Sequence, residues 1–259
     1  MSLLVVRVLA KAFGGVQAVK DVSFHLEAGE MLALIGPNGA GKSTCFNMLN
    51  GQLAADKGSV LFDGRELIGQ RPRDIWRLGV GRTFQITATF ASMTVRENVQ
   101  MALLSHHGEL FSFWRRASHR HGAEADRLLD RVGMLHQADR ACGVLAYGDL
   151  KRLELAVALA NGPRLLLMDE PTAGMAPKER VALMELVAGI AKEEQVSVLF
   201  TEHDMDVVFA HSDRLMVLNR GEIIATGSAD DIRSNDLVKE VYLGGGTTFD
   251  TGREMKSHA

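Results

Sequence analysis

The sequence has only two cysteines, Cys45 and Cys142, among its 259 residues. Their spacing matches no metal-ligand pattern, and they provide no disulfide framework. No stretch reaches the roughly 18–20 consecutive apolar residues that a membrane-spanning helix needs. The apolar start, residues 1–10, contains Arg7 and lacks the basic leader and cleavage site of a secretory signal. We therefore expect a reduced, cytosolic protein that is soluble or attached to a membrane through a partner.

The chain also lacks a strong excess of charge of either sign. It carries 29 Lys and Arg residues against 32 Asp and Glu residues, for a formal net charge of −3. This balance argues against a partner that is a nucleic acid. No internal repeat and no long linker is present. The hydrophobic fraction, 46%, is ample for a large core, and the length suits one large α/β domain or two small ones.

The most specific pattern in the chain is Gly-Pro-Asn-Gly-Ala-Gly-Lys-Ser-Thr at positions 36–44, which matches the phosphate-binding loop G-x-x-x-x-G-K-[ST]. An apolar strand pattern precedes it and a helix pattern follows it, as the motif requires. Successive backbone N–H groups and the helix dipole favour a bound phosphate. Lys42 would add charge for the outer phosphates, and the Ser43 hydroxyl would bind Mg²⁺. The expected nucleotide contacts are Gly36, Pro37, Asn38, Gly39, Ala40, Gly41, Lys42, Ser43 and Thr44.

A second apolar strand pattern, residues 165–168, ends in two carboxylates, Asp169 and Glu170. In a nucleotide-binding fold, the first acid at such a strand end can hold Mg²⁺ through water. The second can act as a general base for the attacking water. Combined with the phosphate loop, this pair predicts a nucleotide hydrolase.

Strand and helix patterns alternate along the chain. Predicted strands cover residues 3–8, 19–26, 31–35, 58–62, 164–168, 196–200, 214–219 and 222–225, with Gly221 in a hairpin turn. Residues 92–160 are predicted to be helical. Thr94 and Glu97 form a capping-box pattern there, and residues 123–132 repeat at helical spacing. This predicts an α/β fold with a mostly parallel core sheet, a smaller antiparallel sheet near the N-terminus and an inserted helical block.

Between the phosphate loop and the acidic strand lies Leu145-Ala146-Tyr147-Gly148-Asp149, at the start of a predicted helix. The order of phosphate loop, Gln85, this helix start and acidic strand resembles the ATP-binding-cassette (ABC) ATPases. The resemblance covers nearly all of residues 3–243 and implies the ABC variant of the phosphate-loop NTPase fold, with ATP and Mg²⁺ as cofactors. We expect residues 1–243 to form a single domain, with the helical block at about 92–160, and residues 244–259 to form a flexible tail.

The resemblance implies roles for further residues. Gln85 would bind Mg²⁺ or position water, and His203 would contact the γ-phosphate and bridge to Glu170. Phe13 would stack on adenine, with core packing as the alternative. The helix start would cap the γ-phosphate held by an opposite subunit, through Ala146, Tyr147, Gly148 and Asp149.

Five stretches resemble the ATPase subunits of branched-chain amino-acid uptake systems, of the larger of two paired types: residues 13–15, 82–85, 145–149, 202–205 and 241–244. This implies an ATP-driven importer subunit at the cytoplasmic face of the inner membrane. Its partners would be a second ATPase, two membrane permease subunits and, indirectly, a periplasmic solute-binding protein. The alternatives are an ATPase for lipopolysaccharide export, an ATPase for amide, urea or aromatic-acid uptake, a non-transport ABC ATPase and a phosphate-loop kinase.

The chain departs from the family pattern at a few positions. Ala146 replaces the usual Ser and Asp149 the usual Gln, while Ala176 stands where many relatives have Asp or Asn. Since Ala176 offers no polar group to a partner, we hypothesise two unequal ATP sites and a non-identical second ATPase. A homodimer is the alternative. The aromatic and basic stretch 110–121 is either a docking surface for membrane subunits or a variable solvated loop.

Overall fold

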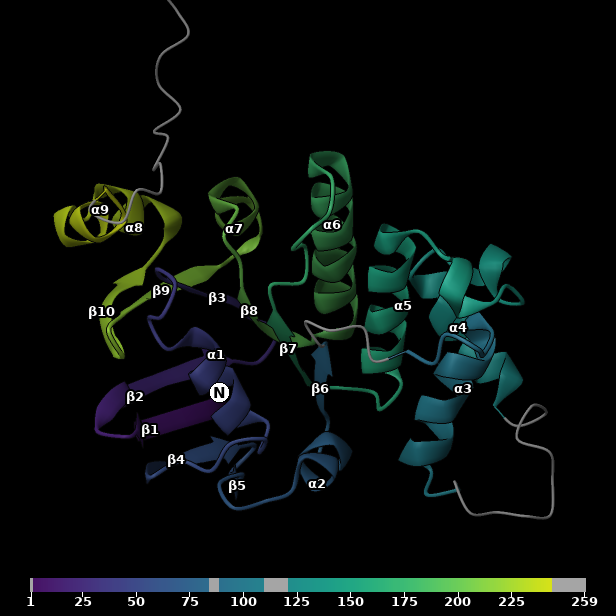
Figure 1. Ribbon diagram of the computed structural model, residues 1–259, viewed down its shortest axis with the longest axis horizontal. Coiled ribbons are helices and arrows are strands. Elements are labelled where there is room, and N and C mark those ends of the chain that lie inside the picture. Colours follow the sequence, from purple (N-terminus) through teal and green to yellow (C-terminus); the bar gives the residue numbers. More distant parts are fainter. Residues whose placement is uncertain (1, 84–88, 110–120, 244–259) are drawn as a thin grey trace, which may run out of the picture.

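The computed structural model describes residues 2–83, 89–109 and 121–243. Gln85, the tail 244–259 and all but the last residue of the aromatic and basic stretch lie outside the described residues. The described chain forms two β-sheets with helices packed around them (Figure 1). Among the described residues, no helix is both long and apolar enough to cross a membrane.

The larger sheet contains six strands in the order β10-β9-β3-β8-β7-β6. These strands are β3 (Met31–Ile35), β6 (Val80–Thr83), β7 (Leu165–Asp169), β8 (Ser197–Thr201), β9 (Arg214–Asn219) and β10 (Glu222–Gly227). Neighbouring strands run parallel except for the β9–β10 hairpin. All residues of β3, β7 and β8 are buried, as expected for parallel strands covered on both faces. The predicted, mostly parallel core sheet is therefore confirmed.

The smaller sheet is antiparallel, in the order β2-β1-β4-β5. It consists of β1 (Ser2–Phe13), β2 (Val16–Glu27), β4 (Lys57–Phe62) and β5 (Arg65–Glu66). The strand predicted at residues 3–8 is too short, because β1 continues to Phe13. At Val8 the backbone adopts a left-handed φ of 50° and its N–H donates to Ser23 Oγ at 2.8 Å. Pairing with β2 then resumes at Leu9, so a bulge continues the strand that the sequence pattern ended.

Helices cover both faces of the larger sheet and one end of the molecule (Figure 1). Their bounds are α1 (Lys42–Leu49), α2 (Pro72–Arg77), α3 (Val95–His106), α4 (Gly122–Arg131), α5 (Tyr147–Leu159), α6 (Pro177–Glu194), α7 (Met205–His211), α8 (Ala229–Ser234) and α9 (Asp236–Leu243), with short 3₁₀ turns at Leu135–Gln137 and Cys142–Val144. The capping box at α3 is confirmed. Thr94 Oγ1 accepts from the Glu97 N–H at 3.2 Å, and Glu97 Oε2 accepts from the Thr94 N–H at 2.8 Å.

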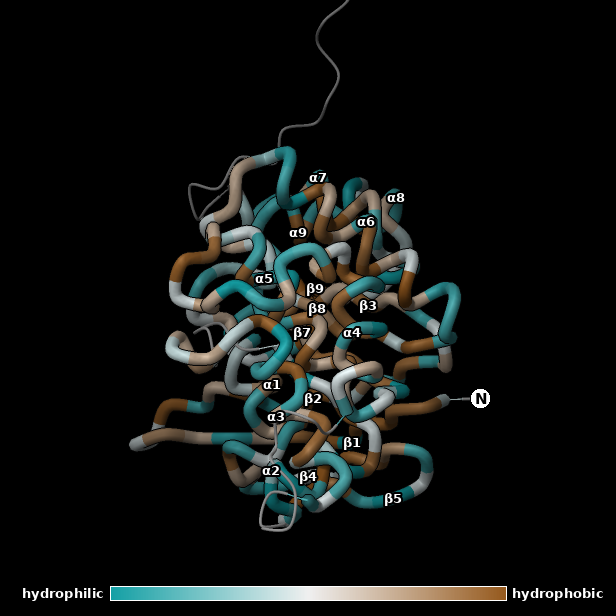
Figure 2. Tube along the Cα trace, turned by 90° about the vertical axis from the view of Figure 1, so that its right-hand side faces the viewer, coloured by the Kyte–Doolittle hydropathy of each residue, from teal (hydrophilic) through white to brown (hydrophobic). Residues whose placement is uncertain are grey.

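Side chains of the core strands alternate between two hydrophobic clusters, because successive residues of a strand point to opposite faces. Leu32 and Leu34 of β3 belong to the cluster against the antiparallel sheet and α1. Ala33 and Ile35 belong to the cluster on the other face. Figure 2 shows the hydrophobic trace inside, along β7, β8 and β9, with hydrophilic segments toward the surface.

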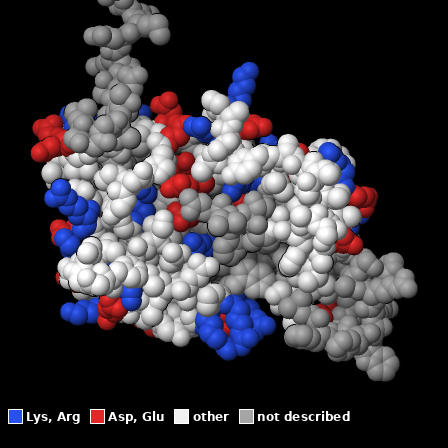
Figure 3. Space-filling model, in the orientation of Figure 1, with Lys and Arg blue, Asp and Glu red and all other residues white. Residues whose placement is uncertain are grey.

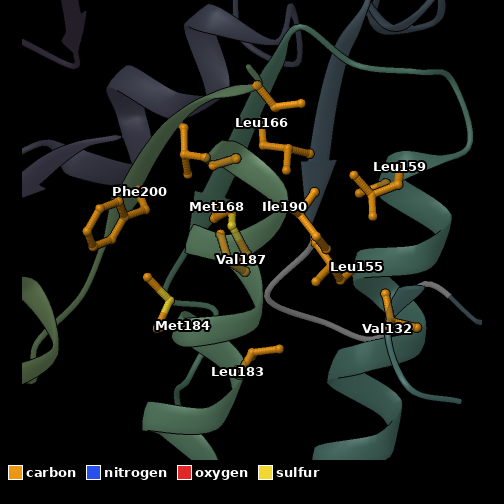
Figure 4. Packing of buried hydrophobic residues seen from close by; sticks show 14 of the residues in the cluster. Val132, Leu155, Leu159, Leu166, Met168, Leu183, Met184, Val187, Ile190 and Phe200 are labelled. Carbon is orange, nitrogen blue, oxygen red and sulfur yellow. The ribbon is translucent and has the colours of Figure 1, made fainter. Parts of the chain in front are cut away.

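The second cluster joins the core sheet to the helical block. Figure 4 shows α6 side chains, among them Val187 and Ile190, packed over Leu166 and Met168 of β7, with Leu155 of α5 alongside. The same cluster continues into α3 and α4 through Val95, Val99, Leu103, Leu128 and Leu129. The sheet and the helical block are therefore joined by one continuous apolar core.

Candidate nucleotide-binding site

The phosphate loop connects the carboxyl end of β3, a central strand, to the first turn of α1. Gly41 precedes α1 in a left-handed conformation with φ of 108°, no side chain caps the helix, and its first turn carries no acidic residue. The N–H groups at this helix start therefore suit an anion. The loop and first turn also carry Pro37, Asn38, Gly39, Ser43 and Thr44, as the sequence predicts.

Two glycines of the loop have no room for a side chain. A Cβ on Gly36 would lie 2.0 Å from the backbone oxygen of Leu218, and one on Gly41 would lie 2.3 Å from that of Ala18. Gly36 and Gly41 also have φ values of 151° and 108°, which glycine adopts readily. The loop pattern is therefore required by neighbouring strands as well as by close approach to a phosphate.

The turn between β9 and β10 braces the other side of the loop. The Gly221 N–H donates to the Ala40 carbonyl at 2.9 Å, and the Gly221 carbonyl accepts from the Lys20 N–H at 2.8 Å. The predicted hairpin is confirmed, with Arg220 and Gly221 both at positive φ as a tight two-residue turn requires. Two parts of the chain remote in sequence thus fix the shape of the phosphate loop.

Lys42 lies over the loop with only 7% of its surface exposed. Its Nζ donates to the Gly36 carbonyl at 2.7 Å and to the Pro37 carbonyl at 3.2 Å. Burial lowers the pKa of Lys42, and the nearby carboxylates Glu170 and Asp169 act against that shift. The ammonium group is therefore directed at the loop and placed within the field of both acids.

The two acids at the carboxyl end of β7, Asp169 as its last residue and Glu170 directly after it, are held by the neighbouring strand β8. Asp169, 4% exposed, accepts a hydrogen bond from Thr201 Oγ1 at 2.8 Å. The backbone N–H of Glu170 donates to the same hydroxyl oxygen at 3.0 Å. Glu170 has a left-handed φ of 51°, uncommon for a residue with a side chain, and its Oε1 lies 2.8 Å from His203 Nε2. The structure thus brings Glu170 and His203 into direct contact, and Thr201 is a supporting residue that the sequence analysis missed.

Glu202 is a second residue whose importance the sequence analysis missed. It is only 5% exposed, and its Oε1 accepts from the Thr172 N–H at 2.8 Å and from Thr172 Oγ1 at 2.7 Å. Burial raises the pKa of Glu202, the Thr172 hydrogen bonds lower it, and the charge of Glu170 raises it further. A carboxylate directly after a buried strand is the same signal that identified Asp169. Glu202 anchors the segment that follows Glu170.

The start of α5 holds the four residues expected to cap the γ-phosphate held by an opposite subunit. Ala146 precedes the helix without a side-chain cap, and Asp149 accepts from Gln137 Nε2 at 2.9 Å. Tyr147 donates its hydroxyl to the Ala173 carbonyl at 3.0 Å, and a Cβ on Gly148 would lie 3.2 Å from a Glu179 oxygen. In Figure 1, β7 and α6 lie between α5 and α1. The structure does not bring these residues to the phosphate loop of the same chain.

The aromatic ring of Phe13 lies at the end of β1 and is 48% exposed. The Lys11 Nζ lies 5.6 Å from the ring centroid. This exposure argues against core packing as the explanation for Phe13.

A further contact links the C-terminal helix to the phosphate loop. Tyr242 of α9 is buried, and its hydroxyl group hydrogen-bonds with the backbone of Gly36. Burial raises the pKa of the phenol above its usual range. No sequence pattern signals this contact, because a lone tyrosine near the chain end carries no spacing to interpret.

A cavity of about 300 Å³ lies beyond β6, on the side of the sheet where the helical block begins. Its wall comes from α2, α3, α5 and β6 and includes Ile75, Trp76, Arg82, Ala102, Ser105 and Val157. Exposed Arg71, Arg73 and Arg77 on and beside α2 form a mainly basic patch at the lower edge in Figure 3, in which Asp74 pairs with Arg71 at 2.6 Å.

The phosphate loop, the Asp169–Glu170 pair and His203 follow β3, β7 and β8, which are neighbours in the sheet. This arrangement at the carboxyl ends of parallel strands defines a phosphate-loop nucleotide hydrolase. The family model described as ABC transporter matches residues 19–173, more than half of the chain. The chain belongs to the ABC transporter family, as an ATP-binding subunit whose ATP hydrolysis is coupled to transport.

Individual relatives agree with this assignment. The chain is 41% identical to the "High-affinity branched-chain amino acid transport ATP-binding protein LivG" of Salmonella typhimurium, over 93% of this chain and 98% of that protein. It is 39% identical to BraF of Pseudomonas aeruginosa, with the same coverage. The crystal structure of an ATP-binding cassette of an ABC transporter in its ADP conformation matches with a TM-score of 0.85 and 32% identity, over 94% of this chain and 99% of that one. A second family model, described as branched-chain amino acid ATP-binding cassette transporter, matches residues 222–247.

Proposed function

We propose that this chain is the ATPase subunit of an importer for branched-chain or related amino acids. The contact between Glu170 and His203, at 2.8 Å beside the phosphate loop, is the observation that supports hydrolysis most directly. The solute class rests on the printed names of relatives at 39–41% identity and on the model matched by residues 222–247.

The residues present fit ATP and Mg²⁺. The phosphates of ATP suit the loop, where glycines allow close backbone approach and the start of α1 has no side-chain cap. Lys42 adds a positive charge directed at the same loop. Ser43, Gln85 and Asp169 would hold Mg²⁺, which would neutralise phosphate charge when bound. Asp169 is already oriented by its hydrogen bond from Thr201 to Oδ1, and its second oxygen lies 4.0 Å from Arg82 Nη2.

Glu170 would act as general base for the attacking water. Its carboxylate is oriented by His203, and its backbone is fixed by the Thr201 hydroxyl. His203 would in turn contact the γ-phosphate, so that base and phosphate are positioned by one imidazole.

Each ATP would lie between the phosphate loop of one ATPase subunit and the α5 start of another. The separation of α5 from α1 in one chain supports this, because residues 146–149 then need a second subunit to reach a nucleotide (Figure 1). Ala176 precedes α6 with no polar side chain to offer across the interface. We therefore keep the hypothesis of a non-identical second ATPase and two unequal sites.

Membrane permease subunits are the partners implied by the family. We propose that this chain lies at the cytoplasmic face of the inner membrane and binds two permease subunits there, near the cavity beyond β6. The exposed arginines of α2 support this, because they lie beside that cavity and suit anionic headgroups (Figure 3). The solute-binding protein would act through the permeases only.

The substitution Glu170→Gln tests the hydrolytic site. The variant should bind ATP with Mg²⁺ at normal affinity and hydrolyse it at least about a hundredfold more slowly, because the general base is lost. Light scattering with ATP then measures pairing: a dimer shows self-association, and a monomer with bound ATP shows that a different ATPase is needed. Glu222→Gln, at an exposed carboxylate paired with Lys20, is the matched control. A normal rate in Glu170→Gln would remove Glu170 from its role.

The solute class is tested separately. The chain is assembled in vesicles with its candidate permeases and solute-binding protein, and uptake of labelled leucine, isoleucine and valine is measured. ATP hydrolysis without uptake of any of the three would overturn the solute class and leave the ATPase assignment intact.

A further inference from the structure

A cluster of histidine and glutamate side chains lies at the outer end of the helical block, away from the nucleotide site. His107 directly follows α3, His121 directly precedes α4, and Glu124 lies in the first turn of α4. One potential ligand atom from each of these three residues lies within 4.8 Å of the other two. None of them belongs to the machinery described for ATP.

The distances within the cluster suit a small divalent ion. His121 Nδ1 lies 3.2 Å from Glu124 Oε2, and His107 Nε2 lies 3.6 Å from the same oxygen. Ligands at about 2.0–2.1 Å from a tetrahedral metal are separated from one another by roughly 3.3–3.4 Å. The two observed distances lie on either side of that value, so the ligand atoms of the three residues are already spaced as for one ion.

A second carboxylate, from Glu109, lies on the other side of the His121 ring. Glu109 Oε2 lies 3.2 Å from His121 Nε2, the ring nitrogen that faces away from Glu124. A neutral imidazole has one N–H and one lone pair, so it can donate to only one of these two carboxylates. If Nε2–H donates to Glu109, the Nδ1 lone pair faces the Glu124 carboxylate. That contact is repulsive unless a cation lies between them.

The cation could be a second proton on His121 or a metal ion. The ring of His107 stacks on that of His121, with centroids 4.4 Å apart and an interplanar angle of 8°. A metal ion at the Glu124 carboxylate would use the lone pairs of both rings, whereas a proton would serve only one ring. We propose that His107, His121 and Glu124 form a binding site for a divalent transition-metal ion of the Zn²⁺ class, with Glu109 orienting His121.

The donor set indicates the kind of ion. Two imidazoles and one carboxylate suit Zn²⁺, Ni²⁺, Co²⁺ or Cu²⁺, whereas Mg²⁺ and Ca²⁺ prefer oxygen ligands. The carboxylate on the far nitrogen of His121 is the arrangement usual around metal-bound histidine, where it fixes the tautomer. Because parallel rings cannot share a metal in both ring planes, the exposed His107 ring would turn about its Cβ–Cγ bond on binding. The ion would then link the end of α3 to the start of α4.

Isothermal titration of the full-length, EDTA-treated protein with Zn²⁺ tests the site. Excess Mg²⁺ is present so that oxygen-rich sites are already filled. The expected result is one Zn²⁺ per chain, with binding lost or weakened well over tenfold in His121→Ala and Glu124→Gln. Glu109→Gln should weaken binding by about 10–100-fold, as loss of a carboxylate behind a ligating histidine does.

His25→Ala is the matched control, since His25 is an exposed histidine 3.9 Å from Glu27 and belongs to no group of three potential metal ligands among the described residues. It should bind Zn²⁺ like the unaltered chain. ATP binding by each variant checks that it is folded, and Co²⁺ as a probe should give the visible absorption of a low-coordinate site. Absence of saturable Zn²⁺ binding, or equal affinity in Glu109→Gln, Glu124→Gln and the unaltered chain, would overturn the proposal.

Discussion

Removing the contact between Glu202 and Thr172 should disturb the segment that carries the general base. Glu202 accepts two hydrogen bonds from Thr172, from the N–H at 2.8 Å and from Oγ1 at 2.7 Å, and both residues are buried. Thr172 follows Glu170 by two positions, so its anchor restricts the path of the chain between the base and α6. We consider the double substitution cycle formed by Glu202→Gln and Thr172→Val.

The magnitude follows from the kind of hydrogen bond that is lost. A hydrogen bond to a charged acceptor contributes about 1.5–3 kcal/mol, and one between neutral groups about 0.5–1.5 kcal/mol. Glutamine keeps an acceptor oxygen, so Glu202→Gln removes about 1 kcal/mol from the bond to Thr172 Oγ1. That difference is the coupling energy that the cycle should show, because Thr172→Val removes the same bond altogether.

Urea unfolding of the four proteins at pH 8 measures the coupling, and steady-state ATP hydrolysis measures its effect on the base. We expect kcat to fall by about one to two orders of magnitude in Thr172→Val, because displacement of a catalytic group by about 1 Å has that effect. The affinity for ATP should stay unchanged, since the phosphate loop is not touched. Additive free energies of unfolding in the cycle, together with normal kcat, would refute the anchoring role.

The pH dependence of stability gives a second check on Glu202. Burial raises its pKa above the ordinary value of 4.5 in the folded protein. The folded state therefore retains a proton that the unfolded state has lost, and stability from this group is present below pH 4.5 and lost as pH rises through the folded pKa. Relative to Glu202→Gln, the unaltered protein should lose stability over that interval. A flat difference between the two unfolding curves would contradict the shift.

Further predictions concern the phosphate loop and the core. Lys42→Ala should abolish ATP hydrolysis and weaken binding of a fluorescent nucleotide, and an unaffected rate would contradict the loop assignment. Tyr242→Phe should lower the free energy of unfolding by about 1 kcal/mol, because the hydroxyl bond to the Gly36 backbone is lost; equal urea midpoints would show that this bond contributes nothing. Burial raises the pKa of the Cys45 thiol to about 12, so iodoacetamide at pH 8 should label it only after unfolding, and rapid labelling of folded protein would exclude this burial.

The sequence predicts the structure most reliably where the chemistry of a site requires a fixed spacing between residues. Gly36, Gly41 and Lys42 sit in one loop whose spacing is a property of the phosphate it binds, and the structure shows the matching strand, turn and helix. The core strands can be predicted from the sequence equally well, because strands buried on both faces must be apolar throughout.

Contacts between segments far apart in sequence could not be predicted in the same way. The hydrogen bonds of Thr172 to Glu202 and of Tyr147 to Ala173 exist because β7 and β8 are neighbours and because α5 packs beside the segment after Glu170. Neither pair has a local pattern. The length of β1 was missed for another reason: a bulge at Val8 breaks the alternation of side chains without ending the strand.

The continuous cluster beneath α6 has a consequence for how the protein melts. Residues of β7 and β8 share it with α3, α4 and α5, so neither the sheet nor the helical block keeps a complete hydrophobic interior when the other unfolds. Heat or denaturant should therefore produce one cooperative transition, with the calorimetric enthalpy equal to the van't Hoff enthalpy. A fragment carrying only the helical block would expose its side of the cluster to water and would not form a stable structure.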